Sequence, residues 1–90
     1  MNVKSAKEMA EKYILDNMQP QAPEGGYVVY EEPEEDQEGW YFSYQSKRYV
    51  ETGDFDYSVV GNWPIFVDRQ GTCPGPRIPP SFSSMEDATE

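Results

Sequence analysis

Between Gly39 and Tyr44 the chain reads GWYFSY, so that aromatic side chains occupy four of six consecutive positions. Aromatic and β-branched residues are enriched in strands because they pack well on a pleated surface. Two further runs of this kind are Tyr27-Val28-Val29-Tyr30, which ends before Pro33, and Pro64-Ile65-Phe66-Val67-Asp68. These three segments are predicted to be strands, with the GWYFSY strand a neighbour of the first.

The residues that follow GWYFSY predict a hairpin. Gln45-Ser46-Lys47 is suited to a turn, and Arg48-Tyr49-Val50-Glu51 is predicted to be a strand antiparallel to GWYFSY. Asp54 is then expected to cap a short helical turn from Phe55 to Val60, which ends at Gly61.

After the strand at 64–68, the chain is expected to turn and then to lose regular structure. Asp68-Arg69-Gln70-Gly71 predicts a turn that leads into a brief strand near Thr72. Four prolines then lie between Pro74 and Pro80, so strand pairing is expected to stop there.

The segment before the first strand predicts one amphipathic helix. Apolar residues recur at steps of three and four, at Val3, Ala6, Ala10, Tyr13, Ile14 and Met18. Ser5 and Glu8 fit a capping box at its start, and Pro20, Pro23 and Gly25-Gly26 prevent its continuation.

These elements together predict an α+β fold, with an N-terminal helix packed on a four- to five-stranded, mainly antiparallel sheet and an irregular Pro-rich C-terminal tail. Ninety residues suffice for one core. We expect residues 1–73 to form that single domain and residues 74–90 to form a Pro-rich, acidic tail.

Charge and cysteine content exclude several classes of protein. Seventeen acidic and seven basic residues give a net charge of −10, which repels nucleic acids and anionic membranes. No stretch approaches the ~20 apolar residues that span a bilayer. The single Cys73 has no internal disulfide partner, and the chain has no His for a zinc set or a Cys/His dyad. A cytoplasmic protein without a cofactor or metal is expected.

A cluster of carboxylates between the first two strands is the most conspicuous charged feature. Its members are Glu31, Glu32, Glu34, Glu35, Asp36 and Glu38. They suit a surface that docks on a basic partner, and they equally suit a solvated loop that keeps the protein soluble. Metal binding fits poorly, because the order of an EF-hand loop is lacking and Pro33 interrupts the run.

The aromatic residues have two interpretations, as core rings or as interface anchors. Trp40 is expected in the core, whereas Trp63, between Asn62 and Pro64, is the better candidate for an exposed partner contact. Enzymatic activity is not expected, since an acid/base pair needs a cleft for which one small sheet leaves little room.

Three segments in succession resemble the immunity protein 35 family of small bacterial proteins. They are Gly39-Trp40-Tyr41-Phe42, the stretch from Arg48 to Asp54 that includes ETGD, and the stretch GNWPIFVD from Gly61 to Asp68. The resemblance covers roughly Ser5 to Gly71. The Pro-rich ending departs from the family pattern, in which the chain commonly continues into another strand and a helix.

This resemblance implies an immunity protein, a cytosolic inhibitor that binds and neutralises the toxin domain encoded beside it. It implies no catalytic residues, and relatives accompany toxins of unrelated chemistry. The carboxylates of the acidic cluster and Trp63 are the candidate contacts. A second hypothesis is an acidic chaperone-like or scaffold protein without a dedicated toxin partner. A decoy that mimics nucleic acid would require carboxylates spaced like phosphates, which one compact cluster does not provide.

Overall fold

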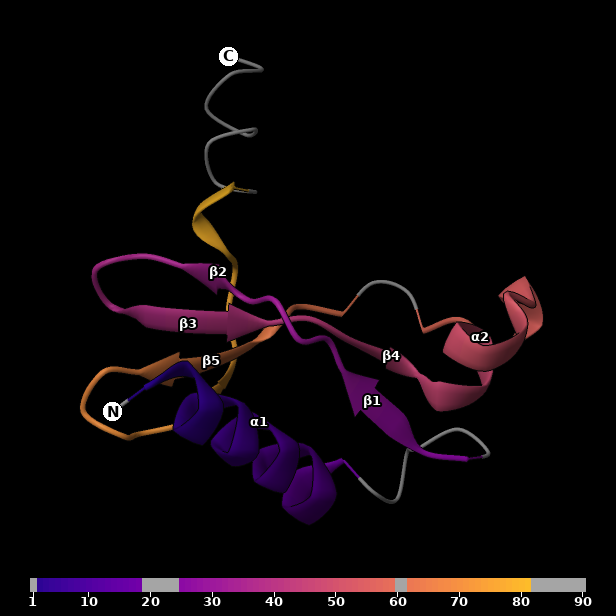
Figure 1. The fold of residues 1–90 in the computed structure, drawn as a ribbon, viewed down its shortest axis with the longest axis horizontal. Helices are drawn as coiled ribbons and strands as arrows, with labels where there is room; N and C mark the ends of the chain where they lie inside the picture. The colour runs from indigo at the N-terminus through magenta and orange to yellow at the C-terminus, as the bar shows by residue number, and fades with distance from the viewer. Residues whose placement is uncertain (1, 19–24, 60–61, 82–90) are drawn as a thin grey trace.

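A computed structural model describes residues 2–18, 25–59 and 62–81. A single long helix, α1 (Val3–Asn17), lies against strands of two antiparallel sheets, and a short helix, α2 (Lys47–Thr52), lies at one end of the molecule (Figure 1). The predicted α+β class with an N-terminal helix is confirmed.

Helix α1 begins one turn earlier than the expected capping box. The Asn2 side chain accepts a hydrogen bond from the Ser5 amide at 2.9 Å, so Asn2 is the N-cap and Ser5 lies inside the helix. The capping box of Ser5 and Glu8 is therefore wrong. The prolines expected to end the helix lie outside the described residues.

Within the described residues, six short strands form two sheets, where four to five strands in one sheet were expected. The smaller sheet pairs β1 (Tyr27–Val29) with β4 (Tyr44–Ser46). The larger sheet has the order β2-β3-β5-β6, and its strands are β2 (Glu34–Glu35), β3 (Gly39–Phe42), β5 (Ile65–Asp68) and β6 (Gly75–Pro76). Every strand pair is antiparallel.

The GWYFSY stretch passes from one sheet to the other at Ser43. Trp40 and Phe42 belong to β3, Tyr44 belongs to β4, and all three rings are buried in the same core. The alternation of a strand thus continues across the break, and the two sheets share one core because a single aromatic stretch supplies both.

Helix α1 closes this core because it contacts β1 as well as β3 and β5. Ala6 and Ala10 are fully buried and Ile14 is nearly so, which gives the helix a narrow, small-residue stripe toward the strands. Small side chains let the helix approach closely. The remaining core members are Val29, Trp40, Phe42, Tyr44, Ile65 and Val67.

The predicted strand Arg48–Glu51 and its hairpin are wrong, because these residues form α2. The Ser46 hydroxyl accepts from the Tyr49 amide at 3.3 Å at the start of α2. Gly53 ends it in the left-handed conformation, at φ 72°. Caps at both ends therefore outweigh the strand preference of Tyr49 and Val50.

A single-turn 3₁₀ helix, η2 (Phe55–Tyr57), follows α2. Its N-cap is Asp54, whose side chain accepts from the Asp56 amide at 3.0 Å, as predicted for the cap. It is shorter than the expected helical turn to Val60, and the expected end at Gly61 lies outside the described residues.

The turn from Asp68 to Gly71 is confirmed by a hydrogen bond from the Gly71 amide to the Asp68 carbonyl at 3.2 Å. Beyond it, Gly75 pairs with Phe66 and Pro76 pairs with Ile65. The expectation that pairing stops at Pro74 is thus wrong, because proline is tolerated on an edge strand such as β6. The division between a domain at 1–73 and a tail at 74–90 stays a prediction.

Candidate functional site

The acidic loop, residues 31–38, joins β1 to β3 and contains β2. Its tip lies at the end of the molecule opposite α2 (Figure 1). Six carboxylates lie in this loop, and five of them have partners elsewhere in the protein or within the loop, as described below.

Glu31 is bound by Lys7 of helix α1. The Lys7 ammonium lies 2.9 Å from Glu31 Oε1 and 3.5 Å from Glu11 Oε2. The hydrogen bond to Glu31, with the charge of Glu11, raises the pKa of Lys7 above its ordinary value against the opposing effect of burial. Helix and acidic loop are thus tied together.

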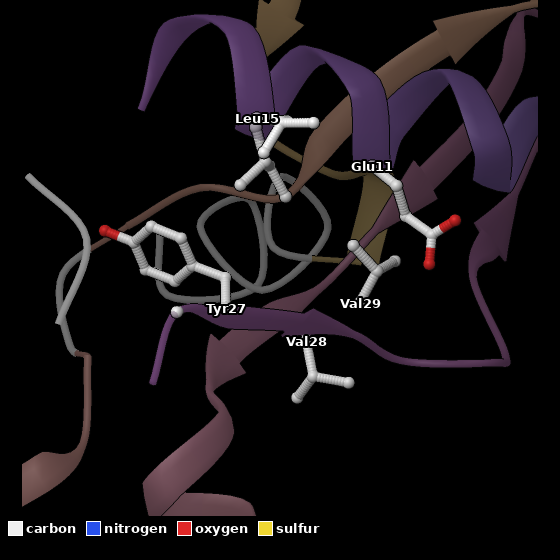
Figure 2. A pocket seen from close by; sticks show the side chains of 7 residues that line it. Glu11, Leu15, Tyr27, Val28 and Val29 are labelled. Atoms are coloured by element: carbon white, nitrogen blue, oxygen red, sulfur yellow. The ribbon is translucent and has the colours of Figure 1, made fainter. Parts of the chain in front are cut away.

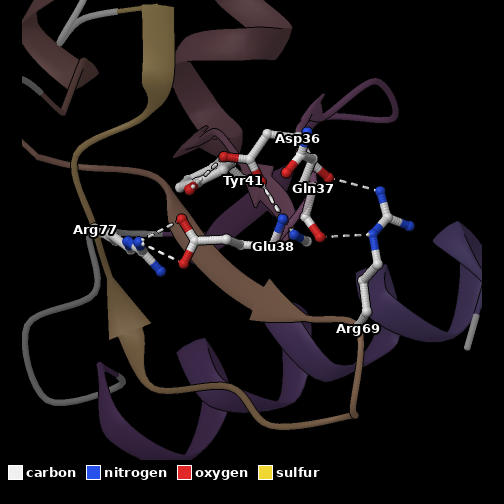
Figure 3. Close-up of polar contacts among 7 residues, drawn as sticks. Asp36, Gln37, Glu38, Tyr41, Arg69 and Arg77 are labelled. Carbon is white, nitrogen blue, oxygen red and sulfur yellow. Dashed lines mark hydrogen bonds and ion pairs between the residues drawn. The ribbon is translucent and has the colours of Figure 1, made fainter.

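Arg69, in the turn after β5, holds the middle of the acidic loop. Its guanidinium lies 2.6 Å from Glu35 Oε2. It also donates to the backbone carbonyls of Asp36 and Gln37 at 2.6 and 3.3 Å (Figure 3). The same guanidinium lies 4.8 Å from the centre of the Trp40 ring. One arginine therefore fastens the loop to the core strand β3.

Arg77, after β6, makes an equivalent contact with Glu38. One guanidinium nitrogen lies 3.0 and 2.9 Å from the two carboxylate oxygens (Figure 3). The same guanidinium covers Phe66 at 4.5 Å from the ring centre. The hydrogen bond to Glu38 raises the pKa of Arg77. An exposed ion pair alone contributes only ~0–1 kcal/mol to stability. The contact of the Arg77 guanidinium with the Phe66 ring adds a second interaction that holds Arg77 beside Glu38.

Asp36 closes the loop on itself. Its carboxylate accepts from the amides of Glu38 and Gly39 at 2.8 and 3.1 Å and from the Tyr41 hydroxyl at 3.0 Å. Burial acts to raise the pKa of Asp36, but these three donors together lower it below the ordinary value. Asp36 therefore stays ionised and organises the turn before β3.

The two remaining carboxylates differ from each other. Glu34 accepts from the amide and the hydroxyl of Ser81, both at 2.7 Å. Glu32 is exposed and has no hydrogen bond or ion pair among the described residues.

The acidic loop is therefore rigid, and it is still negative. Its six carboxylates face three cations, Lys7, Arg69 and Arg77, which leaves 6 − 3 = 3 net negative charges. Sequence reasoning missed these cations, which lie 24, 34 and 39 positions from their partners. The β3–β5 register pairs Gly39 with Asp68 and so brings Arg69 beside the loop, and this pairing is the signal that would have found it.

The structure separates the two tryptophans as predicted. Trp40 is buried, at 3% exposure, and Trp63 is 37% exposed in the segment that leads into β5. The use of Trp63 and of the acidic loop as partner contacts remains a prediction.

An open pocket of about 340 Å³ lies between α1 and β1. Leu15 and Glu11 of the helix face Tyr27 and Val29 of the strand across it (Figure 2). Among the described residues that line the pocket, Glu11 and Tyr27 are the titratable ones. The pocket thus offers apolar contact and no paired acid and base.

The groups that sequence reasoning weighed for chemistry are not assembled in the described structure. Across 2–18, 25–59 and 62–81, no three His, Cys, Asp or Glu side chains lie close enough together to hold a metal ion. Burial raises the pKa of the Cys73 thiol, although a backbone hydrogen bond from Gly75 acts in the opposite direction. The raised pKa reduces the fraction of thiolate at neutral pH. None of the helices in these ranges has the length and apolar character that crossing a membrane requires.

These features define a small α+β protein whose charged surface is braced by its own arginines. The family model described as Immunity protein 35 matches residues 4–87, nearly the whole chain, and the protein belongs to that family. The resemblance inferred from the three motifs is confirmed, and the match also includes the Pro-rich segment from Pro74 to Pro80. Neither the curated proteins nor the solved structures provide a match.

Proposed function

We propose that this protein is an immunity protein that binds a toxin domain encoded beside it and holds that toxin inactive. The observation that carries the proposal is the family match over residues 4–87. The protein acts in the cytoplasm of the producing bacterium, by contact alone and without a cofactor or a reaction of its own.

The charge of the protein supports electrostatic attraction of a basic toxin surface. The net charge is −10, and the acidic loop contributes three net negative charges on one edge of the fold. Fields of this kind accelerate encounter and orient the two partners.

The rigidity of the acidic loop supports the same proposal. Arg69 and Arg77 hold the loop before any partner arrives, so its carboxylates are already in position. A preformed surface loses less conformational entropy on binding than a flexible one. Inhibition then follows from occlusion of the toxin surface.

Co-expression with the neighbouring toxin gene tests the function. Growth rescue by the immunity protein, together with recovery of a stable complex, is the expected result, and a catalytically inactive toxin variant serves for the complex. A toxin from another system is the control that this protein does not neutralise. Continued killing and no complex with the neighbouring toxin would overturn the proposal.

The role of the acidic loop is tested separately, with one variant at a carboxylate that lacks an internal partner and one at a carboxylate that has one. Glu32→Gln removes a charge that has no partner among the described residues, whereas Glu38→Gln also breaks the pair with Arg77. We expect Glu32→Gln to slow association several-fold at low salt without changing the melting temperature. An unchanged association rate and salt dependence in both variants would show that the acidic loop does not take part in toxin binding.

A further inference from the structure

Helix α2 and the turn η2 that follows it lie at the end of the molecule opposite the acidic loop (Figure 1). This segment exposes apolar side chains. Neither element contains a buried residue. Phe55 is 78% exposed and Val50 is 49% exposed. We call the residues Tyr49, Val50 and Phe55 the apolar corner.

The apolar corner is not explained by the stability of the fold. A six-residue helix without a fully buried residue is marginal in water, because its nucleation is costly and little core packing compensates for it. Phe55 contributes little to the core, since most of its ring remains in solvent. Its placement on the surface therefore needs another reason.

Local hydrogen bonds nevertheless hold this segment in one conformation. Ser46 and Gly53 cap α2, and Thr52 Oγ1 donates to the Arg48 carbonyl at 2.8 Å. Asp54 caps η2, and the Ser58 hydroxyl donates to the Phe55 carbonyl at 2.8 Å. Phe55 is thus presented from a preformed turn.

The rings of the apolar corner support one another. Tyr49 and Phe55 lie 5.8 Å apart between ring centres, at 43° between their planes. Phe55 therefore has one aromatic neighbour, Tyr49, while most of its own ring remains in solvent. Aromatic side chains, Phe among them, are enriched in the cores of protein interfaces, and clustered apolar side chains on a surface often mark an interaction site.

Carboxylates surround Phe55 and indicate the charge of the surface that it meets. Asp54 and Asp56 precede and follow it in the chain, and Glu51 lies in α2. All three are exposed, and none forms a salt bridge within the described part of the chain. A partner that covers Phe55 needs basic side chains around the point of contact.

We propose that the apolar corner is the anchoring contact with the toxin domain, with Phe55 inserted into an apolar recess of the toxin that Lys or Arg side chains border. This inference rests on the proposed function. It assigns the main binding energy to the apolar corner, while the acidic loop, whose carboxylates largely have internal partners, acts at longer range.

The test measures binding of the full chain to an inactive form of the toxin domain from the neighbouring gene. We expect Phe55→Ala to weaken binding at least 30-fold, mostly through faster dissociation, and Phe55→Leu to restore part of it. Asp56→Asn is expected to reduce the salt dependence. Circular dichroism and thermal unfolding should show that Phe55→Ala folds as the wild type does, because the ring is mostly exposed.

Leu15→Ala is the matched control, since Leu15 is 59% exposed on α1 beside the pocket at β1. Its affinity should stay within threefold of the wild type. If Phe55→Ala also binds within threefold, the apolar corner is not the anchor, although the immunity function stands. If the wild-type protein itself neither binds nor protects, the proposed function fails first.

Discussion

The Tyr41 hydroxyl donates a hydrogen bond to Asp36 Oδ2 at 3.0 Å and so joins the buried face of β3 to the acidic loop. Tyr41 is only 2% exposed, and its ring packs against Phe66 with 4.8 Å between ring centres. The carboxylate that organises the loop is therefore attached to a side chain that cannot move without disturbing the larger sheet. The acidic loop is thus fixed to the larger sheet through Tyr41.

Tyr41 should titrate only at strongly alkaline pH. Burial, assisted by the hydrogen bond to Asp36, raises the pKa of Tyr41 to about 12. Because the folded-state pKa exceeds the unfolded value of 10.0, the stabilising contribution is complete below pH 10 and is lost as pH rises toward 12.

Absorbance titration of tyrosinate measures this behaviour. We expect a step near pH 12 in the wild type that Tyr41→Phe lacks. The variant should also lose about 1 kcal/mol at pH 7, since one hydrogen bond to a carboxylate is removed. A wild type without a late step, titrating with the free phenol, would contradict the structure.

Asp36→Asn should destabilise the protein in a manner that depends on pH. The folded-state pKa of Asp36 lies below the unfolded 3.8, so its contribution is present above pH 3.8 and is lost as pH falls through the folded-state value. We expect a loss of ~1–3 kcal/mol at pH 7, by chemical unfolding, that diminishes at acidic pH. Glu32→Asn is the control, and a loss that stays constant with pH would refute the assignment.

Gly39→Ala should prevent normal folding. An added Cβ would overlap the Val67 carbonyl oxygen and lie 2.8 Å from the Cα of Asp68, both of which are backbone atoms of the paired strand β5. Because backbone cannot move aside cheaply, we expect a loss of at least ~3 kcal/mol in the free energy of unfolding.

Gly53→Ala is the control for the steric clash at Gly39, because it introduces only the cost of placing an alanine in a left-handed conformation. A Cβ at Gly53 meets nothing within 4 Å, and only the left-handed φ of 72° opposes it. A loss of about 1–2 kcal/mol is expected. Equal losses at the two glycines, by thermal unfolding, would contradict the close approach of β3 and β5.

Phe42→Ala should destabilise the fold strongly, whereas Phe55→Ala should leave its stability nearly unchanged. Phe42 is fully buried between α1 and the strands, so its truncation is expected to cost ~3–5 kcal/mol and to lower the melting temperature sharply. Phe55→Ala is expected to change the free energy of unfolding by less than ~1 kcal/mol. A melting temperature more sensitive to Phe55 than to Phe42 would show that the core is misassigned.

Much of the fold follows from local pattern. The apolar steps of α1, the aromatic runs of β1 and β3, and the strand at Ile65–Asp68 were all predictable, because periodicity and ring content are local properties. Prediction failed at Arg48–Glu51, where strand-forming side chains lie between two helix caps. Single-residue caps are weak signals in sequence, yet they decide the structure of a short segment that has no core to pack against.

The amino-acid sequence by itself determined the apolar positions of the N-terminal helix, that six carboxylates lie in one segment between two strands, and to which family the protein belongs. Only the tertiary structure decided what those carboxylates do, because Lys7, Arg69 and Arg77 reach them from helix and turn positions far along the chain. Likewise, only the three-dimensional packing left Phe55 outside the core, since burial depends on which elements meet and not on the side chain alone.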